Sequence, residues 1–453
     1  MALNTGHQLA NDLVNMKDGW IGREIFVDAD LYEIEKERVF ARAWLFVGFA
    51  DQVRKPGDYF VSRMGEESVI LSRDRDNQIH VFLNSCRHRG MKVCRYDEGN
   101  TPVFTCPYHG WSYAGDGSLV GVPRYKDAYR EELDKSQWGL VEVAQLANYK
   151  GMVWATWDPQ APTFFEYIGD MRPHLDTFLD KPDGSEADLE VIGGVYKWTL
   201  PCNWKFGAEN FIGDVYHTTT THRSADLLRS NPSGIQGRQL ASGVLTPAIS
   251  MNVSHHGSGW RAGIYPPNVD YVPSYPTAPT VETYFQEAHE NRQQSLGERA
   301  RLRGDAPRGG NVFPNTTCGT GQTVGVWHPN GPDSTEVWRW YFMQKDAPQE
   351  AKDLLRHFYM RYGGPAGLTE KDDMENWNYA HRASKGTMAR RYPYHYAMGL
   401  GYEQRNSSLT WLRRDGLVTE KVMTEQNQRG MYKTWADFMD AERWDDVKTM
   451  RGW

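Results

Sequence analysis

The stretch that most constrains the fold of this chain is residues 203–222, which reads N-W-K-F-G-A-E-N-F-I-G-D-V-Y-H-T-T-T-T-H. Its first part contains good helix formers, and Trp204, Phe206 and Phe211 can form an apolar stripe on such a helix. The same stretch carries two carboxylates and two histidines, which are costly to bury unless they are satisfied. A metal would satisfy them, because imidazole and carboxylate are ligands for iron-type divalent metals.

The spacing of the two histidines adds a constraint. His217 and His222 are five residues apart, which on an ideal helix places them about 140° apart around the axis. Four threonines separate them, and β-branched residues are weak helix formers. We therefore predict that the helix distorts or ends within the threonine run, which turns His222 toward His217. The alternative interpretation is a pair of core or surface histidines that follow a helix and bind no metal.

Length and composition exclude several classes of protein. The 453 residues suffice for two or three domains, and a 40% hydrophobic share with 13% aromatic residues supports large buried cores. The formal net charge of -7 gives no basis for nucleic-acid binding. The chain has no run of about 18 apolar residues and no cationic, then apolar, N-terminus, so we predict no membrane span and a cytoplasmic protein. Five cysteines in so long a chain suggest metal or redox chemistry rather than a disulfide framework.

The pattern along the chain predicts three parts. Residues 1–42 are predicted to form an N-terminal helical segment that packs on the body of the protein. Residues 43–160 contain short β-branched and aromatic segments separated by polar turns, which is typical of a small all-β domain. Residues 161–453 mix predicted helices and strands and are interpreted as one larger domain. Within it, residues 225–279 are rich in Gly, Ser and Pro in places and are predicted to be loops that cover a pocket.

The predicted β domain contains two short motifs that carry chemistry. Cys86-Arg-His88 and Cys106-Pro-Tyr-His109 are separated by 17 residues, and each is a cysteine closely followed by a histidine. Two thiolates and two imidazoles can hold a zinc ion, or a [2Fe-2S] cluster with both histidines on one iron. The pattern C-x-H-x17-C-x-x-H resembles the Rieske iron–sulfur signature, and a structural zinc site is the alternative.

A third motif lies near the C-terminal side of the chain. Residues 363–377 read G-G-P-A-G-L-T-E-K-D-D-M-E-N-W. The Asp-Asp pair in this segment can be the N-cap of a helix. It can also supply the carboxylate that a two-histidine iron site needs, and we favour this second role because such a site at His217 and His222 is short of one carboxylate ligand.

With these motifs in view, the chain resembles the large, catalytic subunit of Rieske non-heme iron aromatic ring-hydroxylating dioxygenases. The resemblance covers nearly the whole chain and is closest to members that attack naphthalene, biphenyl and larger polycyclic hydrocarbons. It implies an α+β protein, in which an all-β Rieske [2Fe-2S] domain is joined to a helix-grip catalytic domain with an antiparallel sheet and helices. It also implies a ring of three large subunits, usually capped by three small (beta) subunits.

The resemblance assigns roles by motif. The cluster ligands are Cys86, His88, Cys106 and His109, and the mononuclear Fe(II) ligands are His217, His222 and Asp373. Asp214 matches the residue that links the iron of one subunit to the cluster of its neighbour. Asn210 matches a polar residue near the iron, although an ordinary helix hydrogen bond explains it equally well.

The resemblance also indicates the substrate pocket, at Phe211, Val215, Gly363 and Thr369. Gly363 and Thr369 stand where the family often has large aromatic side chains. Smaller side chains should enlarge the pocket, so the resemblance implies an apolar, bulky fused-ring hydrocarbon as substrate.

The implied activity is the addition of both atoms of O2, the co-substrate, to one ring edge as a cis-dihydrodiol. Electrons from NADH arrive through a reductase and usually a ferredoxin, and the Rieske centre passes them on. A Rieske monooxygenase or demethylase that acts on a bulky aromatic substrate is an alternative, because it shares the same metal ligands. A pure electron-transfer protein would use only the Rieske site, and the long remainder of the chain argues against it.

Overall fold

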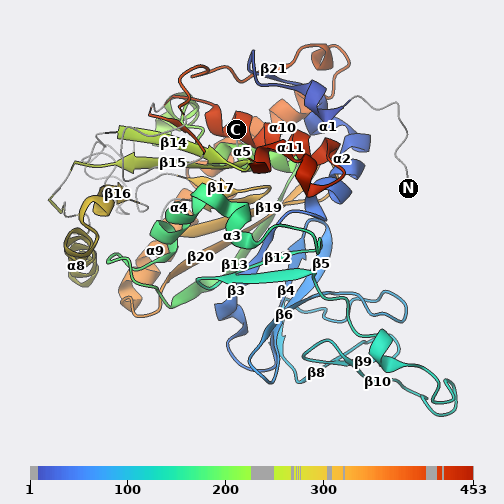
Figure 1. Ribbon diagram of the computed structural model, residues 1–453. Coiled ribbons are helices and arrows are strands. Elements are labelled where there is room, and N and C mark those ends of the chain that lie inside the picture. Colours follow the sequence, from blue (N-terminus) through green and yellow to red (C-terminus); the bar gives the residue numbers. More distant parts are fainter. Residues whose placement is uncertain are drawn as a thin grey trace. The chain divides into compact units, whose positions relative to one another are not determined.

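The computed structural model describes residues 9–225, 249–266, 270–271, 273, 275, 277–303, 309–319, 322–404, 416–420 and 423–451. The chain divides into two compact units. The smaller unit is Phe40–Phe164, and the larger unit combines Met1–Val39 with Phe165–Trp453. Figure 1 follows both units along the chain from blue to red.

The smaller unit consists of three antiparallel sheets. The first contains β6 (Ile79–Leu83), β5 (Glu67–Arg73), β4 (Asp58–Met64) and β7 (Glu98–Asn100). The second contains β11 (Gln145–Tyr149), β12 (Met152–Thr156) and β3 (Leu45–Phe49). The third contains β10 (Leu119–Gly121), β9 (Ser112–Ala114) and β8 (Val103–Thr105). Strands of three to seven residues with polar turns between them explain the short, alternating segments of the sequence.

One apolar core joins the strands of this unit to the loops that carry its cysteines. The core contains Cys86, Cys106, Trp111 and Tyr113 together with strand residues such as Phe82. Burial of these aromatic side chains fixes the two cysteine loops against the sheets, since each large ring removes much apolar surface from water.

The larger unit is built on one antiparallel sheet. In the part of the chain that the structure describes, this sheet has nine strands in the order β13-β20-β19-β18-β17-β15-β14-β22, with β16 paired to β15. Its strands are β13 (Leu189–Leu200), β14 (Ile249–His255), β15 (Ser258–Ile264), β16 (Leu302–Arg303), β17 (Gly310–Val312), β18 (Thr316–Gly319), β19 (Thr323–Pro329), β20 (Thr335–Gln344) and β22 (Leu417–Thr419). A separate small sheet joins β1 (Val14–Asn15), β2 (Trp20–Ile21) and β21 (Tyr394–His395).

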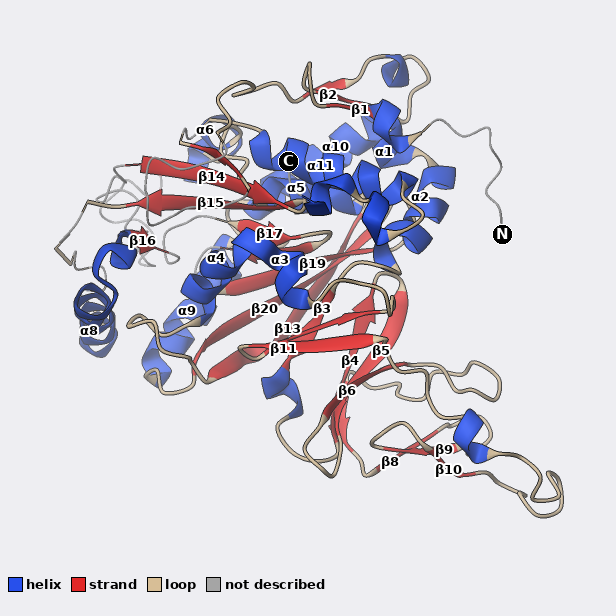
Figure 2. Ribbon diagram, viewed as in Figure 1, coloured by secondary structure: helices blue, strands red, loops and turns tan. Residues whose placement is uncertain are grey.

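Helices lie on and around this sheet, as Figure 2 shows. They are α1 (Glu24–Val27), α2 (Ala29–Glu35), α4 (Arg172–Leu179), α5 (Trp204–Phe211), α6 (Thr218–Thr221), α8 (Pro279–Leu296), α9 (Gln349–Tyr362), α10 (Glu370–Ser384) and α11 (Gln426–Asp440). Helix α3 (Phe164–Ile168) begins at the last residue of the smaller unit. None of the helices in the described residues combines the length and the apolar character that crossing a bilayer requires.

Successive side chains of β20 point to opposite faces of the sheet, and both faces are covered. Tyr341 and Met343 belong to an apolar cluster with residues of α8 and α9. Phe342, between them, points to the opposite face, where its ring lies 5.1 Å from that of Phe178 on α4. Trp327 of β19 shares the face of Tyr341, because its partner Val337 is four residues away from Tyr341 on β20. Helix α5 lies on Trp327, so the central stretch of the sequence is held against the sheet.

The N-terminal segment is attached to α5 by a buried charged cluster. The carboxylate of Glu35, at the end of α2, is fully buried, and its Oε1 lies 2.5 Å from Lys205 Nζ. The indole N–H of Trp204 donates to Glu35 at 2.9 Å, and that of Trp435 on α11 donates to it as well. The residues before Phe40 are therefore part of the larger unit.

Strands β14 and β15 correct one prediction from the sequence. Residues 225–279 were predicted to be loops, but residues 249–264 form this hairpin, while residues 226–248 lie outside the described part of the chain. The turn residues His256 and Gly257 both have positive φ, of 50° and 72°. This conformation is typical of the tight turns that match the twist of antiparallel strands.

Candidate metal centres and the adjoining cavity

The two cysteine-bearing loops of the smaller unit have the same backbone geometry. The amide of Cys86 donates to the carbonyl of Met91 at 2.9 Å, and that of Cys106 donates to the carbonyl of Trp111 at 2.8 Å. The carbonyls of the two cysteines accept from glycine amides four residues later, at 2.8 and 2.9 Å. Both glycines, Gly90 and Gly110, have positive φ (71° and 77°), a conformation that glycine adopts at little cost.

These loops bring the four predicted cluster ligands together. The thiols of Cys86 and Cys106 are buried, whereas the imidazoles of His88 and His109 are partly exposed and their ring centres lie 4.5 Å apart. His88 stacks on Trp111, and its Nδ1 is buried without a hydrogen bond from any described residue. A buried nitrogen without such a bond is expected where a metal takes the lone pair. The donor set fits a [2Fe-2S] cluster whose histidine side faces solvent.

In the larger unit, helix α5 ends earlier than the sequence predicted. Asn203 caps its start by accepting from the amide of Lys205, and the helix stops at Phe211. Gly213 follows with φ of 137°, a conformation that breaks the helix before the threonine run. The threonines form a separate turn, α6, so the prediction that one helix reaches into this run was wrong. The lone turn still brings the histidines together, because His217 and His222 are its N-cap and C-cap residues.

Three predicted ligands converge on one point. His217 Nε2 lies 3.1 Å from His222 Nε2, and Asp373 Oδ1 lies 3.3 Å from each of these nitrogens. Asp373 and His222 are buried, and His217 is partly exposed. Burial raises the pKa of Asp373, although both histidines favour its charged form. Two imidazole nitrogens and one carboxylate oxygen that point at each other match the two-histidine, one-carboxylate ligand set of Fe(II).

Asp214 orients one of these ligands. Its Oδ2 lies 3.1 Å from His217 Nδ1, and its Oδ1 accepts from the amide of Tyr216. Burial favours the neutral form of Asp214, but the hydrogen bond and charge of His217 lower its pKa below the ordinary value. A carboxylate on Nδ1 fixes the tautomer that leaves Nε2 free for a metal. The Asp214 side chain is still 36% exposed, so it also reaches the surface of the single chain.

A buried ion pair holds the helix that carries Asp373. Arg339 of β20 makes two hydrogen bonds to Glu370 in the first turn of α10, one of them 2.7 Å long. Glu370 also accepts from the amide of Gly364. Asp373 follows Glu370 by one helical turn, so this pair anchors the metal carboxylate to the sheet.

Gly363, one of the predicted pocket residues, lies beside this ion pair. A Cβ atom at Gly363 would lie 3.0 Å from Glu370 Oε2 and 3.4 Å from an Arg339 nitrogen. Thr369 is buried and donates to the carbonyl of Tyr362 at 2.8 Å. The structure does not place either residue on the cavity beside the triad. Gly363 therefore lies against a charged pair that no local pattern in the sequence indicates.

The other two predicted pocket residues also lie off this cavity. The ring of Phe211 packs against Trp327 at 5.4 Å and lies below the guanidinium of Arg339. The carbonyl of Val215 accepts from the amide and the hydroxyl of Thr218, at 3.3 and 2.8 Å. Phe211 and Val215 lie close to His217 in sequence, and their described contacts are with the sheet and with α6.

A cavity of about 330 Å³ adjoins the triad. Its walls include His217, Asp373, Asn210 and Asp214, together with residues that no motif indicated. Those residues include Glu209, Tyr394, Tyr396, Glu425 and Gln428. Glu209 was detectable as a carboxylate in an apolar helix, whereas the others come from segments more than 180 residues away and carry no local signal.

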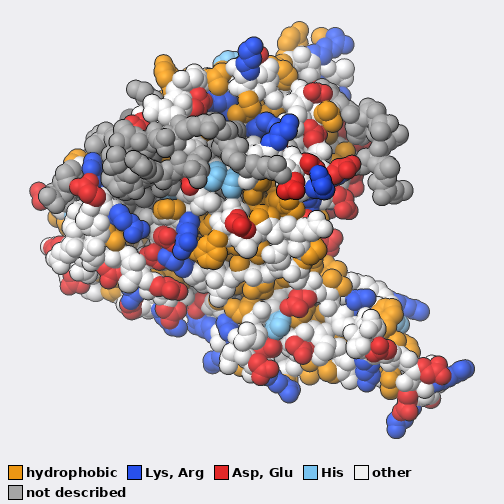
Figure 3. All heavy atoms as spheres, viewed as in Figure 1, with side chains coloured by type: hydrophobic (Ala, Val, Ile, Leu, Met, Phe, Trp, Pro, Cys, Tyr) orange, Lys and Arg blue, Asp and Glu red, His pale blue; other side chains and the backbone are white. Residues whose placement is uncertain are grey.

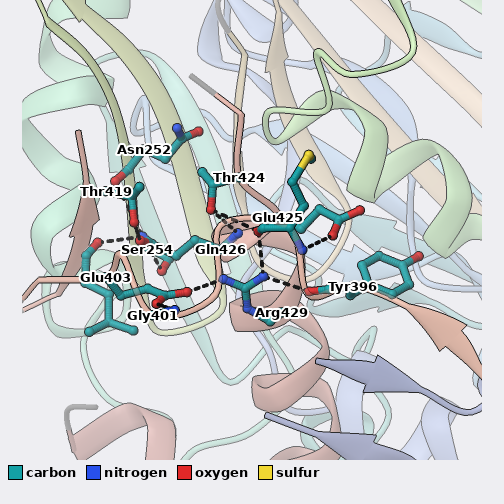
Figure 4. Close-up of polar contacts among 12 residues, drawn as sticks. Asn252, Ser254, Tyr396, Gly401, Glu403, Thr419, Thr424, Glu425, Gln426 and Arg429 are labelled. Carbon is teal, nitrogen blue, oxygen red and sulfur yellow. Dashed lines mark hydrogen bonds and ion pairs between the residues drawn. The ribbon is translucent and has the colours of Figure 1, made fainter. Parts of the chain in front are cut away.

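The far wall of the cavity is held by the polar network in Figure 4. Arg429 of α11 donates to the carbonyls of Tyr396 and Met398 and pairs with Glu403. Glu425 accepts from the amide of Met398 at 2.9 Å. These contacts fix the segment after β21 against the start of α11, so Tyr396 is held rigidly at the cavity.

Comparison with known proteins now decides the family. Residues 43–146 match the Rieske [2Fe-2S] domain, and residues 186–441 match the catalytic domain of the ring-hydroxylating alpha subunit. The chain belongs to the ring-hydroxylating dioxygenase alpha subunits. It is 38% identical to the biphenyl dioxygenase alpha subunit of Paraburkholderia xenovorans (strain LB400), over 96% of this chain and 94% of that protein. It is 36% identical to a benzene 1,2-dioxygenase alpha subunit of Pseudomonas putida, over 97% of this chain and 95% of that protein.

The fold of this alpha subunit agrees with solved structures of relatives. A naphthalene 1,2-dioxygenase variant bound to phenanthrene superimposes with a TM-score of 0.84 at 30% identity, covering 98% of each chain. The predicted α+β class, with a Rieske domain and a catalytic domain, is therefore confirmed. The identification as an aromatic ring-hydroxylating dioxygenase is confirmed as well, and the Rieske domain supports an iron–sulfur cluster rather than a structural zinc.

Tyr113 is a residue near this cluster that the sequence interpretation missed. Its hydroxyl lies 3.2 Å from Cys86 Sγ and accepts from the amide of Arg87 at 3.1 Å. Hydrogen bonds to cluster sulfurs raise reduction potentials. We predict that Tyr113→Phe makes the midpoint potential of the alpha subunit more negative, as measured by redox titration of its EPR signal. Tyr125→Phe, which removes a hydroxyl bonded to the carbonyls of Glu131 and Leu133, should leave the potential unchanged. Equal potentials in the Tyr113 variant and the wild type would contradict this prediction.

Proposed function

We propose that this alpha subunit is the terminal oxygenase component that adds both atoms of O2 to one edge of an aromatic ring, giving a cis-dihydrodiol. In this proposal residues 43–160 carry the cluster and residues 161–453 the mononuclear iron site. The observation that carries it is the convergence of His217, His222 and Asp373 at 3.1–3.3 Å in a chain that also holds the Rieske donor set.

The residues at the proposed iron site are suitable ligands for iron. Two Nε2 atoms 3.1 Å apart, each 3.3 Å from the oxygen of a buried carboxylate, form a compact set of donors that one divalent cation would fit. These three residues would hold a ferrous ion, which would supply the chemistry of O2 activation. Asp214 keeps His217 in the required tautomer. Asn210, on the cavity wall, can donate or accept a hydrogen bond beside the site.

Electron supply is the second part of the proposal. NADH is the source, and a reductase and a ferredoxin carry electrons to the cluster in the cytoplasm. The partly exposed imidazoles of His88 and His109 offer the shortest route in or out, because the two cysteines are buried. The exposed side of Asp214 supports a contact with the cluster of a neighbouring alpha subunit in a trimer. Small beta subunits complete this proposed assembly.

The proposed substrate is an apolar, polycyclic hydrocarbon. The support is the likeness to a naphthalene 1,2-dioxygenase variant that binds phenanthrene and to a biphenyl dioxygenase alpha subunit. Gly363 no longer supports it, since the Arg339–Glu370 pair takes up the space beside this glycine. A Gly363→Phe variant is therefore expected to disturb the ion pair and lower turnover of all substrates alike.

Product analysis with labelled oxygen tests the proposed reaction. The complete system, given ¹⁸O2 and a panel of two- to four-ring arenes, is expected to yield cis-dihydrodiols that carry both labelled atoms. Incorporation of a single labelled atom would instead show a monooxygenase or demethylase and would overturn the proposal. Normal reduction of the cluster with no oxygenated product on any arene would also contradict it, and would favour another substrate class or electron transfer alone.

A further inference from the structure

We propose that Glu209 is a proton-donating residue, which supplies protons through the adjoining cavity to the site of His217, His222 and Asp373. The inference rests on the proposed oxygenase function and deepens it. Neither the family matches nor the names of the relatives assign a role to this residue.

The reaction itself requires a proton source. Converting an aromatic edge and O2 into a cis-dihydrodiol consumes two electrons and two protons, so that each oxygen atom ends as a hydroxyl group. The electrons come from NADH through the redox partners. The protons must reach a buried site, because Asp373 and His222 are both shielded from bulk water. A defined internal donor is therefore needed close to the triad.

The hydrogen bonds of Glu209 suit it to donate into the cavity. The hydroxyls of Tyr396 and Tyr432 both donate to its Oε2, the first at 2.7 Å. With Oε2 occupied by two donors, a proton on this carboxyl group belongs on Oε1. The structure shows no hydrogen bond to Oε1 from the described residues, and the Glu209 side chain lines the cavity. A protonated Oε1 thus has water in the cavity as its partner.

The surroundings keep this carboxyl protonated near neutral pH. Burial raises the pKa of Glu209 to about 8, and the charges of Asp214 and Glu425 act in the same direction. The two tyrosine hydroxyls oppose this shift without cancelling it. The titratable or charged groups around Glu209, from its own helix and the elements packed near it, are Lys205, Asp214, His217, Asp373, Tyr394, His395, Tyr396, Glu425, Arg429 and Tyr432.

The cavity connects Glu209 with the site of His217, His222 and Asp373 and with the surface. Its wall runs from Glu209 and Asn210 to His217 and Asp373, and its volume of about 330 Å³ has room for several waters. Asp214, on the same wall, is 36% exposed and gives the cavity a polar route from solvent. After Glu209 releases its proton to cavity water, a proton entering past Asp214 restores it. Each cycle thus moves protons from solvent to the site with no net change at Glu209.

Infrared titration of the purified holoprotein tests the protonation state without turnover. The wild type should show the C=O band of a neutral carboxyl group that disappears as the pH rises through about 8. Glu209→Gln should lack this band, and Glu350→Gln, at an exposed glutamate of α9, should retain it. The absence of such a band from the wild type, or its persistence in Glu209→Gln, would overturn the inference.

Kinetics test the role in turnover. Below its pKa Glu209 holds the proton, so wild-type product formation should fall as the pH rises through about 8. Glu209→Gln should lower product formation at neutral pH by about tenfold or more, with a changed solvent isotope effect. Its iron content and cluster spectrum should stay normal, and Glu209→Asp should recover part of the rate. Wild-type pH dependence and isotope effect in Glu209→Gln would overturn the inference while leaving the oxygenase function intact. A wild type that forms no diol would instead defeat the proposed function alone.

Discussion

Replacing Asp373 with alanine is expected to abolish product formation while the Rieske cluster remains. Asp373 Oδ1 is the carboxylate atom that meets both histidine nitrogens, and the helix that carries it is anchored by the Arg339–Glu370 pair. Without it, two imidazoles alone hold the metal. The iron content should fall from about three to about two per chain, since the cluster keeps two irons. Turnover should fall by more than about a hundredfold, because even an outer-shell substitution at a metal site costs about 10- to 100-fold.

The neighbouring residue provides a matched control. Asp372 lies in the same first turn of α10 but is not part of the converging group. Asp372→Ala should retain about three irons per chain and most of the activity. Metal analysis, the EPR signal of the reduced cluster and product yield measure the difference between the variants. Equal loss in both variants, or full activity in Asp373→Ala, would show that the triad has been assigned wrongly.

Replacing Glu35 with alanine is expected to cost about 3–5 kcal/mol of folding free energy, because it leaves a buried lysine without its counter-charge. Glu35 and Lys205 are almost completely inaccessible, and two indole N–H groups also depend on the Glu35 carboxylate. Burial lowers the pKa of Lys205, and the carboxylate of Glu35 is what favours its charged form. Since Lys205 lies in the first turn of α5, the metal site should loosen as well.

Thermal and chemical denaturation of the variants measure this effect. Glu37→Ala, two residues away on the exposed side of the same segment, should change stability by no more than about 0.5 kcal/mol. The variant Glu35→Gln keeps the shape of the side chain but not its charge. Its loss of stability should therefore lie between those of Glu37→Ala and Glu35→Ala. A Glu35→Ala protein as stable as the wild type would show that the buried cluster contributes little.

Features that depend on residues close in sequence were predictable. The Rieske loops needed only C-x-H and C-x-x-H, since the backbone bonds that shape each loop span four or five residues. His217 and His222 could be paired because the threonine run between them predicted an irregular backbone that turns His222 toward His217. Asp373, more than 150 residues further on, was proposed because an iron site with two histidines was short of one carboxylate and because the family motif indicated the second aspartate of the pair.

Features that depend on contacts between distant parts of the chain could not be predicted from the sequence. The end of α5 was predicted too late in the chain, because the threonine run was expected to break the helix. The helix ends instead before Gly213, whose φ of 137° depends on contacts that the local sequence does not reveal. The β14–β15 hairpin was missed, because its Gly- and Ser-rich sequence hides burial on both faces. The contact of Gly363 with Arg339 and Glu370 was not foreseen, because nothing in the sequence reveals that these two side chains meet beside it. No local pattern in the sequence indicated that Tyr396 and Glu425 line the cavity.

A single-turnover experiment tests the central claim that two iron centres in this chain spend stored electrons on O2. The fully iron-loaded protein is reduced chemically, freed of reductant and mixed with naphthalene and ¹⁸O2 in the absence of reductase and ferredoxin. The account predicts about one cis-dihydrodiol per occupied site, with both oxygen atoms labelled and the cluster oxidised in step. Reduced, iron-loaded protein that forms no oxygenated arene, or a product whose oxygen comes from water, would contradict it.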